Sequence, residues 1–326
     1  MNRIPLGVDI SKATFDVSLE VGGKVKHSKF DNMQVGYAKC LKWARDLYLG
    51  EQHFHVCMEA TGAHWCGLAE FCHAAGQTVS VVNPARIKGH AQSQALRHKT
   101  DKQDAEVIRH YCATQSPPAW TPPSPEIKAL REMVRRRDDL TQHMTSETNR
   151  AKSGAYTGEA LASVARSREF IKQELKQVAK AIKELVKAHA KLAHSVKLMR
   201  SVKGLGFDTA VRLIAEVTNL DKMTDANALA ASLGVTPVQR ESGTSIKARP
   251  RMSKQGNSTV RAALWWPAIK AMDINPIVRA MADRLRKKHK PRMVIIIACM
   301  HKLLNLACGV LRTQQPFDPD WHPATH

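Results

Sequence analysis

The stretch IPLGVDISKATFDVSLEVGGKVKHSKF, residues 4–30, contains three short runs in which apolar and polar side chains alternate. Residues 4–10 and 15–20 have the composition of β-strands and are joined by the tetrapeptide SKAT, and KVKHSKF at 24–30 alternates as a third run. Turns as short as these connect antiparallel neighbours in a sheet. The stretch therefore predicts a meander of three antiparallel strands at the start of the chain.

Helical and strand-like runs alternate after the meander. We expect a helix at 33–48, a strand at 54–58, a helix at 64–75, a strand at 78–84 and a helix over KTDKQDAEVIRHYC at 99–112. A meander followed by alternating helices and strands is the topology of the ribonuclease H fold. Residues 1–115 are therefore predicted to form one α/β domain.

Four carboxylates occupy positions that a metal-dependent nuclease needs. Asp9 and Glu59 follow apolar strand-like runs, so we expect both at one edge of the sheet, where α/β folds place their sites. Asp101 and Asp104 are three residues apart on a helix and share one face. Such oxygen ligands suit Mg²⁺, and two ions roughly 3.5–4 Å apart clamp the attacking and leaving oxygens of a phosphodiester. The alternative is that these acids are helix caps and dipole partners.

The charge of the chain points to a polyanionic partner. Fifty Lys and Arg stand against 29 Asp and Glu, which gives a formal net charge of +21. Residues 240–292 hold fourteen of the basic residues and three acids, a net of +11 and more than half of the total. So large an excess repels itself unless phosphates neutralise it, which favours DNA or RNA as the partner.

The same sequence argues against a secreted or membrane protein. No signal-peptide core can be drawn near the amino terminus, because Arg3 and Asp9 interrupt the apolar run there. The longest apolar stretch, MVIIIACM at 293–300, is too short for a bilayer and is expected as a buried helix. The seven cysteines lack CxxC pairs and no His/Cys cluster has the spacing of zinc ligands. We therefore expect reduced thiols and a cytoplasmic protein.

A proline-rich linker and two long helices follow the first domain. SPPAWTPPSP, 116–125, contains five prolines and predicts an extended linker. A charged helix is expected from residue 126, with a break near Gly154–Gly158. A second helix spaces its apolar residues by steps of four and three from Ile171 to Met199, which is the seam of a coiled coil over the region 126–200. We expect this seam to associate between chains, with an intramolecular hairpin as the alternative.

The remaining region, 201–326, is expected to be mostly helical. Gly204 and Gly206 precede a helix and resemble the hairpin of helix-hairpin-helix modules, whose backbone N–H groups receive a phosphate; a tight helix connection has the same appearance. Trp265 and Trp266 are suited to stacking on bases, but their place in an apolar helix favours the core. The whole chain is thus of the class α/β plus α.

Motifs along the chain resemble the DEDD transposases of the insertion sequence one-hundred-and-ten (IS110) family. VDISK at 8–12, MEATG at 58–62, VVNPARIK at 81–88 and KTDKQDA at 99–105 resemble its RuvC-like amino-terminal domain. The resemblance implies that Asp9, Glu59, Asp101 and Asp104 bind the catalytic metals. LGVTP at 233–237, ESG at 241–243, RMSKQGN at 251–257 and VRAALWWPA at 260–268 resemble its carboxy-terminal transposase domain.

The second catalytic element implied by the resemblance is a serine in ESG, here Ser242. A serine hydroxyl that attacks a phosphodiester stores the bond energy in a phosphoserine that can be rejoined, which a hydrolytic nuclease does not need. Basic residues crowd this stretch and are candidates for binding the scissile phosphate: Arg240, Lys247, Arg249, Arg251 and Lys254. Without the resemblance, a Ser before a Gly is typical of a turn.

The resemblance further implies a recombinase that excises and inserts its mobile element, with double-stranded donor and target DNA and a structured noncoding guide RNA as partners. It implies a homo-oligomer, a dimer that becomes a tetramer when active, in which the RuvC-like domain of one subunit meets the serine of another. Two other classes stay open on the residues alone. One is a RuvC-like junction-resolving or hydrolytic nuclease in which Ser242 is structural, and the other is a non-enzymatic nucleic-acid-binding coiled-coil protein.

Overall fold

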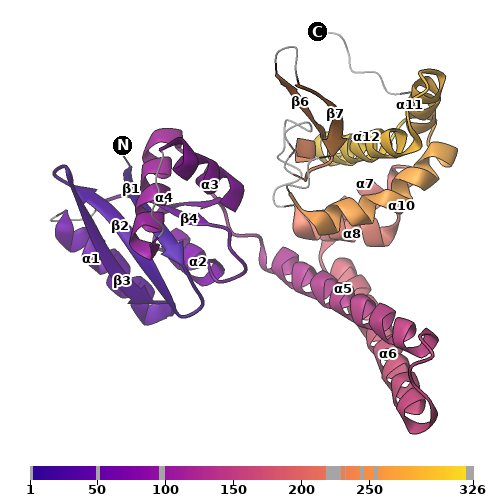
Figure 1. Ribbon diagram of the computed structural model, residues 1–326, viewed down its shortest axis with the longest axis horizontal. Helices are drawn as coiled ribbons and strands as arrows, with labels where there is room; N and C mark the ends of the chain where they lie inside the picture. Colours follow the sequence, from indigo (N-terminus) through magenta and orange to yellow (C-terminus); the bar gives the residue numbers. More distant parts are fainter. Residues whose placement is uncertain are drawn as a thin grey trace. The chain divides into compact units, whose positions relative to one another are not determined.

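The chain folds into two compact units, Met1–Pro122 and Pro123–His326, each with its own hydrophobic core (Figure 1). This computed structural model describes residues 3–48, 52–94, 100–217, 229–231, 233–242, 246–252 and 256–320. The expected coiled-coil region and the carboxy-terminal region lie in the same unit.

A mixed five-stranded sheet forms the centre of the first unit, in the order β3-β2-β1-β4-β5. Its strands are β1 (Ile4–Ile10), β2 (Thr14–Val21), β3 (Lys24–Asp31), β4 (Phe54–Glu59) and β5 (Thr78–Val82). The first three pair antiparallel, whereas β4 pairs parallel with β1 and with β5. The predicted meander is confirmed, and the mixed sheet is consistent with a ribonuclease H-like fold.

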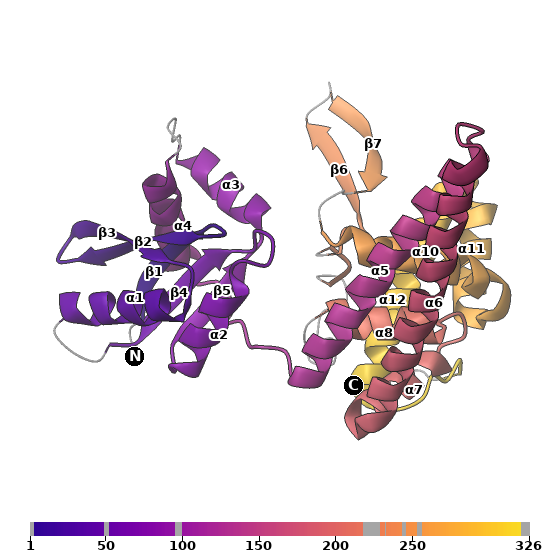
Figure 2. The ribbon, with the colours of Figure 1, turned by 90° about the horizontal axis from the view of Figure 1, so that it is seen from below.

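Helices cover both faces of this sheet (Figure 2). Helices α1 (Gln34–Leu47) and α2 (Cys66–Ala74) pack on the face that carries Leu6, Val8 and Phe15. Helices α3 (Pro84–Ser93) and α4 (Asp101–Gln115) pack on the other face, which carries Cys57. The period of two along each strand thus assigns every side chain to one layer or the other.

Helix α3 is absent from the sequence prediction, which extended the preceding strand to residue 84. The strand ends at Val82 because the next two residues start a helix. The side chain of Asn83 accepts a hydrogen bond from the Ala85 N–H at 2.9 Å, and Pro84 occupies the first helical turn. Both residue types are strong start signals at these positions, so the sequence contained the information.

Helix α4 approaches β1 closely at Gly7. A Cβ atom at this position would lie 2.2 Å from the carbonyl oxygen of Ala105 and 2.3 Å from the backbone nitrogen of Arg109. Only glycine leaves room for helix backbone at that distance. Gly7 therefore fixes how near the helix that carries Asp101 and Asp104 lies to the sheet.

The proline-rich segment is extended, and it lies against the edge strand of the first unit. The Trp120 N–H donates to the Val79 carbonyl at 2.6 Å, and Ser80 Oγ lies 3.0 and 2.9 Å from the carbonyl oxygens of Pro117 and Pro118. The Trp120 ring also meets Trp65 edge-on, with centroids 5.7 Å apart. Residues up to 120 are therefore held on the first unit and do not form a free tether.

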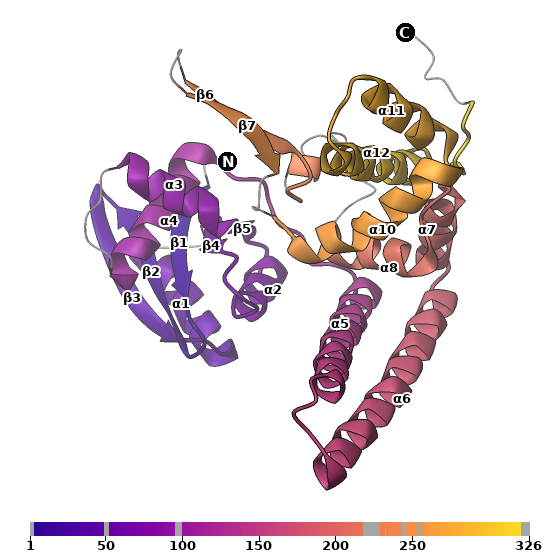
Figure 3. The same ribbon diagram turned by 45° about the vertical axis from the view of Figure 1, so that its right-hand side comes forward.

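The second unit begins with a helical hairpin. Helices α5 (Pro125–Lys152) and α6 (Gly158–Ala188) pack on each other within one chain (Figure 3). Ile182 of the expected seam is fully buried in one cluster with Leu130 and Val134 of α5. The intramolecular hairpin, which the sequence left as the alternative, is therefore present.

The expectation of one continuous helix through Met199 is wrong, because the chain breaks at His189. This residue has extended backbone angles, φ −118° and ψ 102°, and separates α6 from α7 (Ala190–Ser201). Its Nδ1 lies 2.9 Å from the Leu185 carbonyl oxygen. The regular apolar spacing continues across the break, since Leu192 and Val196 are buried, so the spacing alone did not reveal it.

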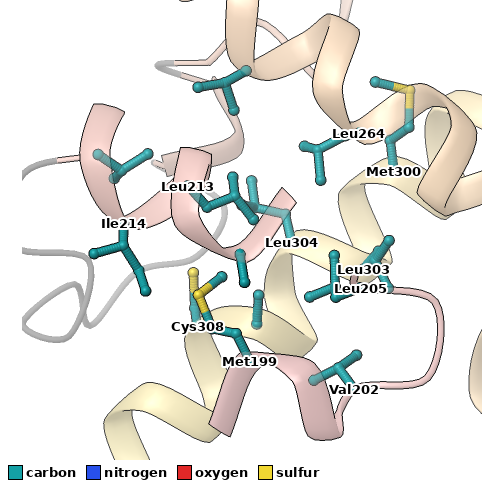
Figure 4. Close-up of a cluster of buried hydrophobic side chains, with 14 of the residues drawn as sticks. Met199, Val202, Leu205, Leu213, Ile214, Leu264, Met300, Leu303, Leu304 and Cys308 are labelled. Carbon is teal, nitrogen blue, oxygen red and sulfur yellow. The ribbon is translucent and has the colours of Figure 1, made fainter. Parts of the chain in front are cut away.

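Helices of the carboxy-terminal region build the rest of the second core (Figure 4). Met199 of α7, Leu213 of α8, Leu264 of α10 and Leu303 of α12 belong to one buried cluster. The bounds are α8 (Phe207–Glu216), α10 (Ser258–Ile274), α11 (Pro276–Lys287) and α12 (Arg292–Thr313), with a hairpin of β6 (Pro237–Ser242) and β7 (Ile246–Met252).

Two expectations about apolar residues in this region need correction. Helix α12 is long and apolar enough to cross a membrane by length and composition alone, yet it packs in the core through residues such as Ile295 and Cys299. The expected burial of 293–300 fails at its start, where Met293 and Val294 are exposed. Trp266 was expected in the core and is 73% exposed, because it falls on the outer face of α10.

The glycines between α7 and α8 have a structural reason. Gly204 has a positive φ of 108°, and a Cβ there would lie 2.7 Å from the Cβ of Ala271 on α10. Asn275, which is fully buried, donates to the Lys203 carbonyl at 3.0 Å and caps α11 by accepting from the Ile277 and Val278 N–H groups. A tight helix connection thus accounts for Gly204.

We predict that Gly7→Ala destabilises the first unit, because the new methyl group must push α4 away from β1. Overpacking against backbone costs about 1–3 kcal/mol. Gly89→Ala is the matched control, since Gly89 lies in α3 with open space around its Cα, and alanine favours helices by roughly 0.5–1 kcal/mol. Urea unfolding of the three proteins measures both effects. Equal stability of Gly7→Ala and Gly89→Ala would show that the close approach is not needed.

Candidate active site

A row of charged residues crosses the sheet on the face that packs against α4. Asp9 on β1 stands opposite Asp16 on β2, and Asp16 stands opposite Lys29 on β3. Residues directly opposite in antiparallel strands point to the same face, and Asp9 shares its face with Gly7, two residues earlier. The three side chains therefore lie next to one another under the start of α4.

Glu59 extends this row on the other side of β1. Glu59 is the last residue of β4. Met58 pairs with Val8, so Glu59, one residue further along β4, is level with Asp9 on β1. Its carboxylate accepts a hydrogen bond from Thr61 Oγ1 at 2.8 Å. The strand ends here, so the carboxylate lies at the edge of the sheet where the parallel pair β1 and β4 terminates.

The two remaining acids begin α4. Thr100 caps the helix by accepting from the Gln103 N–H at 3.3 Å, and Asp101 and Asp104 follow in the first turn. Acids at a helix start are stabilised by the macrodipole, so their position alone is explained without catalysis. Their effect on Asp9 is the evidence that they also share a site.

The charges of all these acids converge on Asp9. Its pKa is raised from 3.8 to about 6, first by burial and then by the charges of Asp104, Asp101, Glu59 and Asp16. Like charges and desolvation both disfavour the ionised form of a carboxyl group. The other three acids singled out from the sequence, and Asp16 as a fourth neighbour, therefore lie near enough to Asp9 for their charges to act on it.

These residues fit a hard divalent cation by their chemistry. The cluster offers carboxylate oxygens, which Mg²⁺ prefers, and its excess negative charge is what a cation relieves. Across the described part of the chain, however, no three His, Cys, Asp or Glu side chains already stand in a metal-holding group. The acids therefore lie near one another without forming a ready-made set of metal ligands among the described residues.

Asp16 and Lys29 were not recognised from the sequence. Lys29 Nζ lies 3.1 Å from an Asp16 carboxylate oxygen and 3.8 Å from one of Asp101, and the bond to Asp16 raises the pKa of Lys29. A hollow of about 450 Å³ next to them is lined by Asp16, His27, Ser28, Lys29, Thr100, Asp101 and Lys102. The signal was the short turn after Asp9, which sets the register that brings Asp16 opposite.

The candidate serine lies in the second unit. Ser242 is the last residue of β6, paired with Ile246 of β7 at the turn end of a two-stranded hairpin that projects from the helices of its unit (Figure 3). Strand residues here include Arg240, Lys247, Arg249 and Arg251, whereas Lys254 lies outside the residues that the structure describes. Four of the five basic candidates therefore lie on the same two strands as the serine.

Two transposase families match this chain. One, described as transposase, matches residues 6–155, which include all four predicted acids. The other, described as the transposase IS116/IS110/IS902 family, matches residues 196–283, which include Ser242 and the basic residues around it.

Curated relatives carry related descriptions. The "Pilin gene-inverting protein" of Moraxella bovis is 29% identical over 328 residues, which cover 99% of this chain and 100% of that protein. The "Transposase for insertion sequence element IS1111A" of Coxiella burnetii is 25% identical over 289 residues, 79% of this chain and 75% of that protein. These similarities indicate an enzyme that acts on DNA, in transposition or recombination, and they favour this class over the non-enzymatic alternative.

We predict that Asp9→Asn stabilises the metal-free protein above pH 6. Asp9 ionises near pH 4 in the unfolded chain but only near pH 6 in the folded protein. As pH increases from about 4 to about 6, the unfolded chain therefore loses this proton first, and the folded protein becomes less stable relative to it. The amide removes this cost of roughly 1–2 kcal/mol, after allowance for solvent screening. Urea unfolding in the presence of a chelator measures this cost at about pH 4.5 and at about pH 8, which lie below and above the pKa of Asp9 in the folded protein.

The control is Asp46→Asn, which removes an exposed carboxylate from α1 on the opposite face of the sheet. It should leave the unfolding free energy within about 0.5 kcal/mol at both pH values. Equal behaviour of the two variants would show that Asp9 does not stand in a cluster of repelling acids.

Proposed function

Since the chain carries both transposase domains of the IS110 family and acts on DNA, we propose that it is a site-specific recombinase that excises and inserts a mobile element. The convergence of the charges of Asp101, Asp104 and Glu59 on Asp9 carries this proposal, because carboxylates from separate elements repel one another unless they share a cation. Such a set of acids is what phosphoryl transfer with Mg²⁺ requires.

The first half of the site would be held by the first unit. We assign one or two Mg²⁺ ions to the carboxylates of Asp9, Glu59, Asp101 and Asp104. When bound, the metal supplies electrostatic stabilisation of the negative charge that develops on the scissile phosphate. Asp9 and Glu59 are placed by strand ends and Asp101 and Asp104 by one helix turn, so the backbone fixes the places from which the four side chains would reach the metal.

The second half would be Ser242. Its Oγ forms a bond to the phosphorus while the bond from phosphorus to the leaving deoxyribose oxygen breaks; the hydroxyl loses its proton, and the leaving oxygen takes one up. No water is consumed, so the phosphodiester energy stays in the phosphoserine until a hydroxyl from the other DNA attacks and releases the serine. Arg240, Lys247, Arg249 and Arg251 would neutralise the phosphate.

Nucleic acids are the partners that the charge supports. We assign donor and target duplex DNA and a structured noncoding guide RNA to the basic residues of the carboxy-terminal region, where 240–292 carries +11. Trp266 is exposed on α10 with Lys270 one turn away, which suits stacking on an unpaired base. The same strand exchange at two sites in one molecule inverts the DNA between them, as the name of the Moraxella bovis relative describes for that protein.

An assembly of several chains is part of the proposal, as a dimer that becomes a tetramer when active. The acids and the serine belong to different units, so one chain's acids can serve another chain's serine. Helix α6 also exposes apolar side chains that its partner α5 does not cover: Phe170 is 62% exposed and Leu161 39%. A second copy of the helical hairpin is the occupant that we assign to them.

We predict that Ser242→Ala abolishes the covalent protein–DNA adduct and lowers recombination at least about a thousandfold, while nucleic-acid binding persists on the basic surface. Denaturing gels of radiolabelled DNA with Mg²⁺ present detect the adduct. Asp104→Ala should likewise give neither adduct nor product, with binding retained. Wild-type recombination by Ser242→Ala would reject the serine mechanism, and metal-dependent nicking by it without any adduct would favour the hydrolytic nuclease.

We predict that Phe170→Glu splits the oligomer, because it places a charge in an apolar contact between chains. Phe170 is exposed within one chain, so the substitution should leave the fold intact. Gln173→Glu, one turn away on the same helix and also exposed, adds the same charge as a control. Light scattering measures the mass, and an unchanged mass for Phe170→Glu would remove this surface from the assembly.

A further inference from the structure

Lys29 makes two ion pairs of unequal character. Its Nζ lies 3.1 Å from Asp16 Oδ2, whose side chain is only 10% exposed, and 3.8 Å from Asp101 Oδ2, whose side chain is 70% exposed. A short pair to a nearly buried carboxylate is costly to break, since the carboxylate would lose its partner away from water. A longer pair to an exposed carboxylate exchanges easily with solvent or with another cation.

The register of the sheet gives Lys29 this double role. Adjacent strands lie about 4.8 Å apart, and one strand, β2, lies between Lys29 on β3 and Asp9 on β1. The long lysine side chain spans part of these two strand spacings over Asp16. Asp101, the first residue of α4, lies above this part of the row. Lys29 therefore reaches one proposed metal ligand while it remains anchored on a residue that is not one.

We propose that Lys29 is a positioning residue that acts as an internal counter-cation of the acid site and competes with the divalent metal for Asp101. Asp16 anchors the ammonium group, and Asp101 is held by it until the metal arrives. This inference rests on the proposed metal site and adds a residue that regulates how tightly the site binds its metal. Two observations agree with it. Asp101 is paired with Lys29, and no complete metal-holding group is preformed among the described residues.

The competition has a direct thermodynamic consequence. A metal ion must displace one positive charge from Asp101 before it gains that oxygen, so Lys29 raises the metal concentration at which the site assembles. Removal of the lysine also leaves the five carboxylates without their counter-charge, which further favours a divalent cation. Lys29 would thus suppress metal binding at low concentration without taking part in the chemical step.

The test is Mn²⁺ binding to the full-length protein, followed by the electron paramagnetic resonance signal of the free ion. Lys29→Met should bind Mn²⁺ about tenfold more tightly than the wild type, and Lys29→Arg, which keeps the charge, should stay within about threefold. Lys102→Met is the matched control, because Lys102 lines the same hollow and makes no ion pair among the residues described. It should change the affinity less than about twofold.

A double substitution distinguishes the anchoring of Lys29 by Asp16 from the effect of net charge alone on metal binding. Asp16→Asn should weaken Mn²⁺ binding in the wild type, because Lys29 is then left to Asp101 alone, and should have a smaller effect in the Lys29→Met background. Additive effects, or equal tightening by Lys29→Met and Lys102→Met, would mean that only the net charge matters and would overturn the inference. Weaker binding by Lys29→Met would overturn it as well.

Failure of this inference is distinguishable from failure of the metal site. If Asp9→Asn and Asp104→Ala leave Mn²⁺ binding unchanged, the proposed site itself is wrong. If both abolish binding and Lys29→Met has no effect, only the role of Lys29 is wrong. Recombination supplies a second reading: Lys29→Met should lower the Mg²⁺ concentration for half-maximal rate about tenfold and leave the rate at saturating Mg²⁺ unchanged.

Discussion

The contact between helix α4 and strand β1 at Gly7 is the constraint on which the candidate site depends. Helix backbone lies where any other residue would place a Cβ atom, so the first turn of α4 lies low over the sheet. Asp101 and Asp104 are thereby brought close enough to Asp9 for their charges to act on it. A helix placed one side-chain layer further out would leave the same acids as ordinary dipole partners at a helix start.

The proximity of the acids to Asp9 has an electrostatic cost, and two features of the fold reduce it. Burial and four neighbouring carboxylates hold the pKa of Asp9 near 6, while Asp16, the most buried of the neighbours, is paired with Lys29. Lys29 also lies 3.8 Å from Asp101, so a cation from solution would have to compete with it for that outer acid. Folding stability and ion binding are therefore linked, because whatever neutralises the cluster stabilises the unit that carries it.

The sequence predicted those features that depend on local pattern. Alternation located the meander, and strand ends and helical spacing singled out Asp9, Glu59, Asp101 and Asp104. Features that arise from packing between elements were missed: nothing local marks Gly7 as a contact with α4, and the place of Lys29 depends on the pairing of three strands. The break at His189 escaped for a related reason, since apolar spacing persists across it.

The division of the chain bears on how strand exchange would be controlled. The acids belong to one compact unit and Ser242 to another, so neither unit holds both halves of the proposed chemistry. In the proposed mechanism, a phosphodiester is the group that both halves would recognise. A serine kept apart from the acids would then attack only when DNA and the correct partner chain are both present. Under that mechanism, assembly would limit premature cleavage, because the catalytic groups would be brought to the phosphate only in the complete complex.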